Sequence, residues 1–213
     1  MSTSVIFDAL WARYDEWYER HRAIAESEAR LVAHLLSDAP QPLIEVGVGT
    51  GYFAQKIGAS AGLDPSINML RVARKRGIPL LVAGVGERQP FRSSVFGSAL
   101  IVVTLCFADS PEKLLKETYR VLRRGGVLVS CIVPADSSWG RYYANLGAKG
   151  HAFYSRARFL SRSEHEDLIA RAGFLIEATM GVLRWKPWES EAVDEPGPAE
   201  GDVGFVCVKG VKP

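Results

Sequence analysis

The chain has 213 residues, 47% of them hydrophobic, which is enough to bury a core and excludes a largely disordered polymer. The 26 basic and 24 acidic residues leave a net charge of +2, which gives no electrostatic support for nucleic acid as a partner. We expect neither a signal peptide nor a membrane span, because the N-terminus is charged and aromatic and no apolar run is long enough to cross a bilayer.

The chain begins with two expected helices. Aromatic and apolar residues recur at helical spacing over 5–20 and again over 22–37, where Pro40 and Pro42 end the pattern. Strands and helices then alternate. The expected strands are 42–47, 60–64, 79–83, 98–106 and 126–133, and the expected helices are 51–58, 66–76 and 111–123. This alternation is typical of parallel strands with right-handed crossovers, and it predicts an α/β fold with a doubly wound, mostly parallel sheet.

A glycine turn follows the first of these strands, with Gly47, Gly49 and Gly51 at every second position. Residues without a Cβ can form a tight, partly left-handed turn and let a ligand approach the backbone. Gly51 is expected to open a helix whose free N–H groups point toward the same space. In an open α/β sheet, ligands bind at the carboxyl ends of the strands, so this turn is the expected site.

The second strand ends at Asp64, 17 residues after Gly47. An acid at this position can accept hydrogen bonds from both hydroxyl groups of a ribose, which predicts a nucleoside-like ligand. Dinucleotide-binding turns have the pattern G-x-G-x-x-G, whereas this chain has Thr50-Gly51-Tyr52. A nucleotide-binding oxidoreductase is therefore disfavoured. Ser66 and Ser110 are expected to cap the helices that follow them.

The pattern changes after Pro134. Residues 137–160 are rich in aromatic and small side chains, show no clear strand, and are expected to form short helices over the site. Ser163 with Glu166 predicts a capping box at the start of a helix over 163–172.

Two strands are expected to complete the sheet, at 174–184 and 203–209. The acidic, proline-rich stretch 186–202 between them is expected to be a mobile loop.

Three cysteines, Cys106, Cys131 and Cys207, lie in apolar, strand-like runs. Their odd number and wide spacing argue against a disulfide framework and against a zinc site. We therefore expect reduced core thiols in a cytoplasmic protein, and no metal site.

Five segments, in order, resemble class I S-adenosylmethionine-dependent methyltransferases, and among them the ubiquinone/menaquinone-biosynthesis group. Glu45–Gly51 and Gly62–Ser66 are similar to motif I and its successor. The other three segments are Trp11–Trp17, Gly84–Phe91 and Tyr119–Gly126. The resemblance covers about residues 7–134, with a looser match at 155–178.

Two positions depart from the family pattern. Val85 replaces an acid of the block that contacts adenine, which puts that contact in doubt, and Arg124 replaces a turn proline. Neither change affects the glycine turn or Asp64.

The resemblance implies seven strands in the order 3-2-1-4-5-7-6, the last antiparallel. It also implies a single domain. Its expected parts are an N-terminal helical lid at 1–38, a cofactor-binding core at 42–134, a cap insertion at 135–162 and a C-terminal helix and strand pair at 163–213.

The resemblance further implies S-adenosyl-L-methionine as cofactor and S-adenosyl-L-homocysteine as product. Glu45 either holds the turn or reaches the methionine moiety through water, and both interpretations stay open. The expected cofactor contacts are Tyr14, Glu45, Gly47, Gly49, Gly51, Asp64, Pro65, Met69, Gly86, Glu87, Thr104 and Leu105.

Methyl transfer by in-line displacement needs mainly correct positioning and exclusion of water. The chain lacks the Asn/Asp-Pro-Pro-Tyr and Pro-Cys segments used on nucleic-acid bases, which favours a small-molecule acceptor under an aromatic cap. His151, Tyr14 and Tyr143 are the weak catalytic candidates. A catalytically silent cofactor-binding module and a methyltransferase acting on protein or RNA remain alternatives. The sequence indicates neither the acceptor atom nor the oligomeric state.

Overall fold

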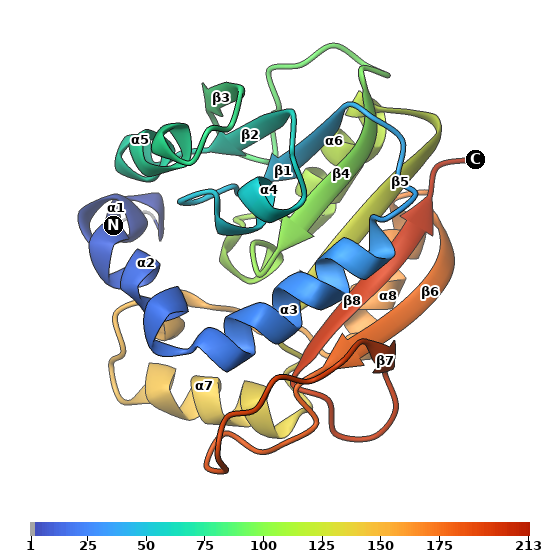
Figure 1. Cartoon of the computed structure of the whole chain (residues 1–213). Helices are drawn as coiled ribbons and strands as arrows, with labels where there is room; N and C mark the ends of the chain where they lie inside the picture. Colours follow the sequence, from blue (N-terminus) through green and yellow to red (C-terminus); the bar gives the residue numbers. More distant parts are fainter. Residues whose placement is uncertain (1–2) are drawn as a thin grey trace.

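Eight strands form one mixed sheet in the computed structural model, which describes residues 3–213 (Figure 1). Their order is β3-β2-β1-β4-β5-β8-β6-β7. The strands are β1 (Leu43–Val46), β2 (Ala61–Asp64), β3 (Leu80–Ala83), β4 (Phe96–Val102), β5 (Leu122–Ile132), β6 (Leu175–Val182), β7 (Gly197–Pro198) and β8 (Phe205–Val211). The helices are α1 (Thr3–Ala9), α2 (Trp11–Arg20), α3 (Arg22–Leu35), α4 (Tyr52–Lys56), α5 (Ile67–Lys75), α6 (Pro111–Val121), α7 (Ser138–Ala148) and α8 (Arg162–Arg171), with 3₁₀ turns η1 (Leu105–Phe107) and η2 (Tyr154–Arg156).

The sheet confirms the predicted fold class. Neighbouring strands from β1 to β5 pair in parallel, and β8 runs antiparallel between β5 and β6. The sheet differs from the expected seven strands only by β7, a two-residue strand that pairs with β6 at the edge. Every residue of β1, β2 and β4 is buried, which explains their continuous apolar sequences.

Helices cover both faces of the sheet. One buried cluster joins α3, α4 and α5 to the sheet, and a second joins α6 and α8 to it. Ser66 and Ser110 cap α5 and α6 as predicted. In Figure 1, α1, α2 and α7 lie beyond the carboxyl ends of the parallel strands. Within residues 3–213, no helix combines the length and the apolar character that crossing a membrane requires.

Several boundaries differ from those expected. The helix predicted over 5–20 is divided at Leu10 into α1 and α2. Strand β4 ends at Val102 because Val103 has a positive φ of 46°, which no strand accommodates, and η1 follows. Strand β5 begins at Leu122, before the glycine pair, where Leu122 pairs with Phe96 of β4.

The capping box of α8 lies two residues earlier than predicted. The Ser161 hydroxyl accepts the N–H of Glu164 at 3.2 Å, and the Glu164 carboxylate accepts the Ser161 N–H at 2.7 Å. The prediction from Ser163 and Glu166 was wrong, because Glu166 instead accepts a hydrogen bond from Thr179 of β6.

Cys131 and Cys207 form a disulfide. They are directly opposite in the antiparallel pair of β5 and β8. The prediction of three reduced thiols was wrong for this pair, because a separation of 76 residues conceals that the two strands are neighbours. Cys106 is free and buried, so the reduced-thiol argument applies to it alone.

The stretch 186–202, which was expected to be a mobile loop, makes hydrogen bonds to other parts of the chain. The Asp194 N–H donates to the Ser27 hydroxyl of α3 at 2.8 Å, and Glu191 pairs with His21. Its end is held by Asp202, which accepts a hydrogen bond from Lys186 at 2.6 Å. These contacts place the stretch beside α3.

Candidate active site

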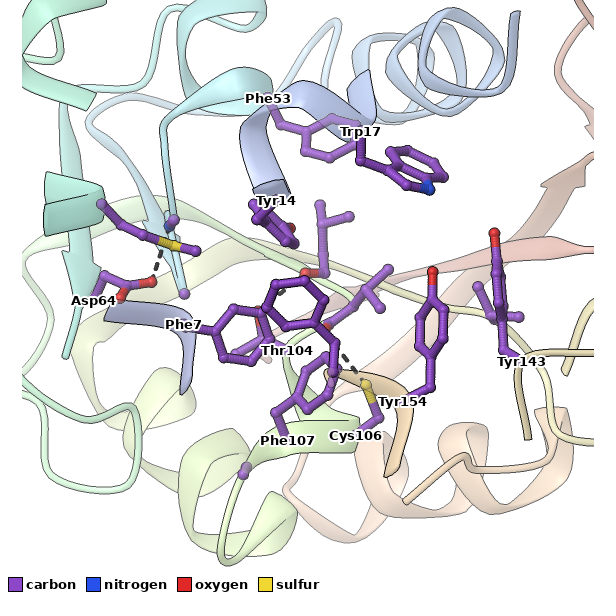
Figure 2. A pocket seen from close by; sticks show the side chains of 18 of the residues that line it. Phe7, Tyr14, Trp17, Phe53, Asp64, Thr104, Cys106, Phe107, Tyr143 and Tyr154 are labelled. Atoms are coloured by element: carbon purple, nitrogen blue, oxygen red, sulfur yellow. Dashed lines mark hydrogen bonds between the residues drawn. The ribbon is translucent and has the colours of Figure 1, made fainter. Parts of the chain in front are cut away.

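A cavity of about 460 Å³ lies at the carboxyl ends of β1, β2 and β4. The strand ends and the glycine turn form one part of its wall, and side chains of α1, α2, α3, α7 and η2 form the rest. In Figure 2, Asp64 lies on one side of the cavity and Tyr143 and Tyr154 lie on the other, with Tyr14 and Thr104 between them. The cavity therefore has two chemically different ends.

At the glycine turn the cavity wall is formed by backbone atoms, without side chains. Gly47 and Gly49 line the cavity with φ values of 78° and 51°. A Cβ on Gly47 would lie 2.3 Å from Oγ1 of Thr104, so no other residue fits between β1 and the end of β4. Gly51 does not line the cavity. It precedes α4 in a left-handed conformation, and its Cβ would lie 3.1 Å from Ala73 of α5.

The carboxylate of Asp64 is buried but keeps unused positions for accepting hydrogen bonds. Its Oδ2 accepts the N–H of Gly49 at 2.9 Å, and its Oδ1 accepts the N–H of Ser66 at 2.8 Å. Each carboxylate oxygen has two acceptor positions, so each keeps one for a ligand hydroxyl. Burial raises the pKa of Asp64 to about 6. The residue lines the cavity, which fits the predicted ribose contact.

The loop after β3 closes the same end of the cavity. Val85, Gly86 and Glu87 all line it. A Cβ on Gly86 would lie 2.7 Å from Leu114 of α6, so the loop packs directly on this helix. The Glu87 carboxylate accepts the N–H of Ser110 at 3.3 Å, whereas Val85 offers no polar group to a ligand.

Pro65 and Met69 also line this end, beside Asp64. Met69 is 2% exposed, and a Cβ on Gly49 would lie 3.5 Å from its sulfur. The start of α5 therefore packs beside the glycine turn at this end of the cavity.

Besides Gly51, two predicted contact residues, Glu45 and Leu105, do not reach the cavity. Glu45 is buried, and its carboxylate accepts a hydrogen bond from the backbone of Ala54 in α4. Its Oε2 has no partner among residues 3–213, and burial raises its pKa. This geometry favours the interpretation that Glu45 holds the turn. Leu105 is buried in the sheet cluster with α6 and α8.

The opposite end of the cavity is aromatic. Tyr14 and Tyr18 of α2 are joined through their hydroxyl groups at 3.0 Å. Tyr143 of α7 and Tyr154 of η2 have ring centroids 4.4 Å apart, and the ring of His151 stacks on Tyr154 at 4.4 Å. Segments distant in sequence thus supply one continuous aromatic wall.

His151 lines the cavity but is held by a cation. Nη2 of Arg13 lies 3.3 Å from Nε2 of His151. Burial, and after it the charge of Arg13, lower the pKa of His151. The neutral imidazole is therefore favoured, with one ring nitrogen directed at Arg13.

Two polar links hold the N-terminal helices over the site. The Asp8 carboxylate of α1 accepts hydrogen bonds from the Ser66 hydroxyl at 2.7 Å and from the Asn68 N–H at 2.9 Å. Arg76 pairs with Asp15 of α2 at 2.7 Å and donates to the carbonyl of Thr50 in the glycine turn, also at 2.7 Å.

The sequence analysis missed Glu28 of α3. It lines the cavity and is 6% exposed. The helical pattern carried a signal for it, because Ile24, Leu31 and Leu35 define a buried face on which Glu28 is the only acid. Trp17 of α2, at the end of the Trp11–Trp17 segment, also lines the cavity and is not among the predicted site residues.

The two ends suit different parts of a reaction. Backbone N–H groups and a carboxylate suit a hydroxylated nucleoside, and the aromatic end suits a second, less polar molecule. No group of three residues that could hold a metal ion occurs within the described chain.

Comparison with known proteins gives a consistent result. Residues 44–130 match the family model described as a methyltransferase domain. The chain is 38% identical over 206 residues to an uncharacterized protein of Mycobacterium tuberculosis, covering 94% of this chain and 71% of that one. It is 34% identical over 210 residues to an uncharacterized protein of Methanocaldococcus jannaschii, covering 97% and 98% of the two chains.

A solved structure from Thermotoga maritima has the same fold with a TM-score of 0.91. It is 35% identical, and the match covers 99% of this chain and 100% of that one. That protein is described as an S-adenosylmethionine-dependent methyltransferase, possible histamine N-methyltransferase. Matches to demethylmenaquinone methyltransferases cover only 43% and 59% of this chain.

Proposed function

The chain belongs to the S-adenosylmethionine-dependent methyltransferases, and we propose that it moves the methyl group of this cofactor to a small-molecule acceptor. The observation that carries the proposal is the continuity of one cavity between Asp64 and the aromatic wall of α2, α7 and η2. A methyl donor bound beside Asp64 can therefore reach an acceptor bound at the aromatic wall, because both ends belong to the same cavity.

The residues at the first end fit the cofactor. The ribose hydroxyls donate to the free acceptor positions of Asp64, and the missing Cβ of Gly49 leaves space between the backbone and Met69. The adenine lies toward Gly86, with Val85 contributing only apolar contact. Glu45 acts indirectly by holding the turn.

Bound S-adenosylmethionine supplies a methyl group on a sulfonium, which is activated for in-line displacement without a further catalyst. The protein has to align the acceptor and exclude water. Tyr14 and Thr104, between the two ends, define the place where donor and acceptor meet (Figure 2). The neutral ring of His151 lies in the aromatic wall, where it limits the shape of the acceptor.

We propose that α1, α2 and residues 137–160 act together as the lid. The aromatic wall is built from these segments, and Asp8 and Asp15 fasten the N-terminal helices to α5. The division into lid, core, cap and C-terminal part at the ranges given above belongs to the same proposal, as does a cytoplasmic location.

A cavity of about 460 Å³ with an aromatic end supports a small acceptor over a protein or an RNA, whose reactive group must enter on a large scaffold. The partial matches to demethylmenaquinone methyltransferases support a place near the ubiquinone/menaquinone group, with an apolar ring as one acceptor class. A silent cofactor-binding module has only Val85 in its favour.

The test uses the purified chain and the cofactor with a labelled methyl group. We expect calorimetry to show binding of S-adenosylhomocysteine and none of NAD. We expect label transfer to appear in a small-molecule extract and to be absent from added protein and RNA. Label found only in polymer, or binding without transfer to any acceptor, contradicts the proposal.

A further inference from the structure

Glu28 is a buried acid that has no polar partner among residues 3–213. It lies on α3, lines the cavity and is 6% exposed. Across residues 3–213, its carboxylate forms neither an ion pair nor a hydrogen bond. By contrast, the neighbouring acid Glu26 lies on the outside of the helix and pairs with Arg30 and Lys56.

The basic side chains that line the cavity contact groups other than Glu28. Arg13 faces His151, Arg20 pairs with Glu16, and His21 pairs with Glu191. Burial raises the pKa of Glu28 to about 8, and no cation or hydrogen-bond donor among residues 3–213 opposes this shift. The carboxyl therefore holds its proton at neutral pH, and its ionisation is favoured when a cation that residues 3–213 do not supply lies beside it.

Glu28 lies within electrostatic reach of the aromatic wall. Burial raises the pKa of Tyr14, Tyr143 and Tyr154, and the charge of Glu28 raises each of them further. These rings come from α2, α7 and η2, and they line the same cavity as Glu28. Ring faces attract cations, and a carboxylate beside them adds a full opposite charge.

We propose that the methyl acceptor is a basic amine, whose ammonium group pairs with Glu28 among these tyrosine rings. The proposal rests on the proposed function, because it names the substrate class of the same site. A neutral acceptor gains no ionic contact from the Glu28 carboxyl, and an anionic acceptor would meet a like charge if the carboxyl ionised. An ammonium supplies both the opposite charge and hydrogen-bond donors.

The test measures ligand binding to the protein saturated with S-adenosylhomocysteine. The probes are matched sets with one scaffold and different ends: 2-phenylethylamine, 2-phenylethanol and 3-phenylpropanoate, with tryptamine and tryptophol as a second set. We expect the amines to bind at least tenfold more tightly than the alcohols, and the carboxylate not to bind.

Glu28→Gln is expected to bring the amines to the affinity of the alcohols, without changing the affinity for S-adenosylhomocysteine. Glu26→Gln is the matched control on the same helix, and it is expected to leave the amine preference intact. Label transfer from S-adenosylmethionine across the same sets provides a second readout.

Absence of any amine preference in the unaltered protein, in binding and in transfer, overturns the proposal without involving a variant. An amine preference that persists in Glu28→Gln also overturns it. If this variant instead loses affinity for S-adenosylhomocysteine and keeps the amine preference, Glu28 serves the cofactor and the proposal is wrong. The proposed function fails separately, by the lack of cofactor binding or of any label transfer.

Discussion

The Asp64 carboxylate at the end of β2 accepts a hydrogen bond from the backbone N–H of Gly49 at 2.9 Å. This bond links the second strand to the glycine turn that follows the first. The acid that is available to a ligand thus also sets the shape of the backbone that the ligand approaches. Changes at either residue are expected to affect cofactor binding before they affect the fold.

Asp64→Ala is expected to weaken binding of S-adenosylhomocysteine about ten- to a hundredfold. The removal leaves two ribose hydroxyls without their acceptor, which costs on the order of 1–3 kcal/mol. Calorimetry measures the dissociation constant, and circular dichroism checks that the fold persists. An unchanged dissociation constant shows that Asp64 is only a strand-end residue.

Cofactor affinity is expected to fall as the pH is lowered through about 6. Burial raises the pKa of Asp64 from its ordinary value of 3.8 to about 6, and the ionised form is the better acceptor of hydroxyl hydrogen bonds. Titration of the dissociation constant between pH 5 and pH 8 checks this, at about half-unit steps. If the dissociation constant of Asp64→Asn depends on pH in the same way, a group other than Asp64 is responsible for the titration.

Gly47→Ala is expected to lower the melting temperature and weaken cofactor binding together. The new Cβ would lie 2.3 Å from Oγ1 of Thr104, and the φ of 78° is strained for alanine. Gly58→Ala is the matched control, since Gly58 also has a positive φ but has nothing within 4 Å of its Cβ. The control is expected to show only the conformational cost of about 1–2 kcal/mol. Equal effects of the two changes would mean that contact with Thr104 is unimportant.

Glu28→Gln is expected to stabilise the folded protein near neutral pH. Burial raises the pKa of Glu28 from 4.5 to about 8, so the folded state holds its proton more tightly than the unfolded state does. The free energy of unfolding therefore falls as the pH rises from about 4.5 to about 8. In Glu28→Gln the free energy of unfolding does not fall in this way, and the difference from the parent is about 3 kcal/mol at neutral pH.

Thermal unfolding of both proteins at several pH values measures this difference. The two curves are expected to converge below about pH 4.5, where the carboxyl is protonated in both states. If the variant is less stable than the parent at neutral pH, the Glu28 carboxyl has a stabilising partner and this prediction is wrong.

Replacement of Tyr14 and Tyr143 by alanine is expected to lower turnover far more than cofactor affinity. Both residues line the cavity, Tyr14 between its two ends and Tyr143 at the aromatic end, and their loss is expected to admit water and loosen the acceptor (Figure 2). Tyr119→Ala is a suitable control, because Tyr119 packs on Phe174 on the other face of the sheet. If neither Tyr14→Ala nor Tyr143→Ala lowers turnover, the proposal that these segments form a lid is wrong.

Local features were predictable because they depend on residues close together in the chain. The glycine turn, Asp64 and the caps at Ser66 and Ser110 each act within a few residues. The apolar runs of β1 and β4 identify buried strands, since a strand covered on both faces needs no polar side. The order of the sheet followed from the resemblance to a known family.

The tertiary structure decided what depends on segments far apart in the chain. Cys131 and Cys207 meet because β8 inserts beside β5, and no local pattern encodes that pairing. The aromatic wall requires α2, α7 and η2 to converge on one cavity. Glu28 looked like one more charged residue on an amphipathic helix. Only packing buried it with no polar partner in the described part of the chain, because burial and compensation of a charge depend on every element around it.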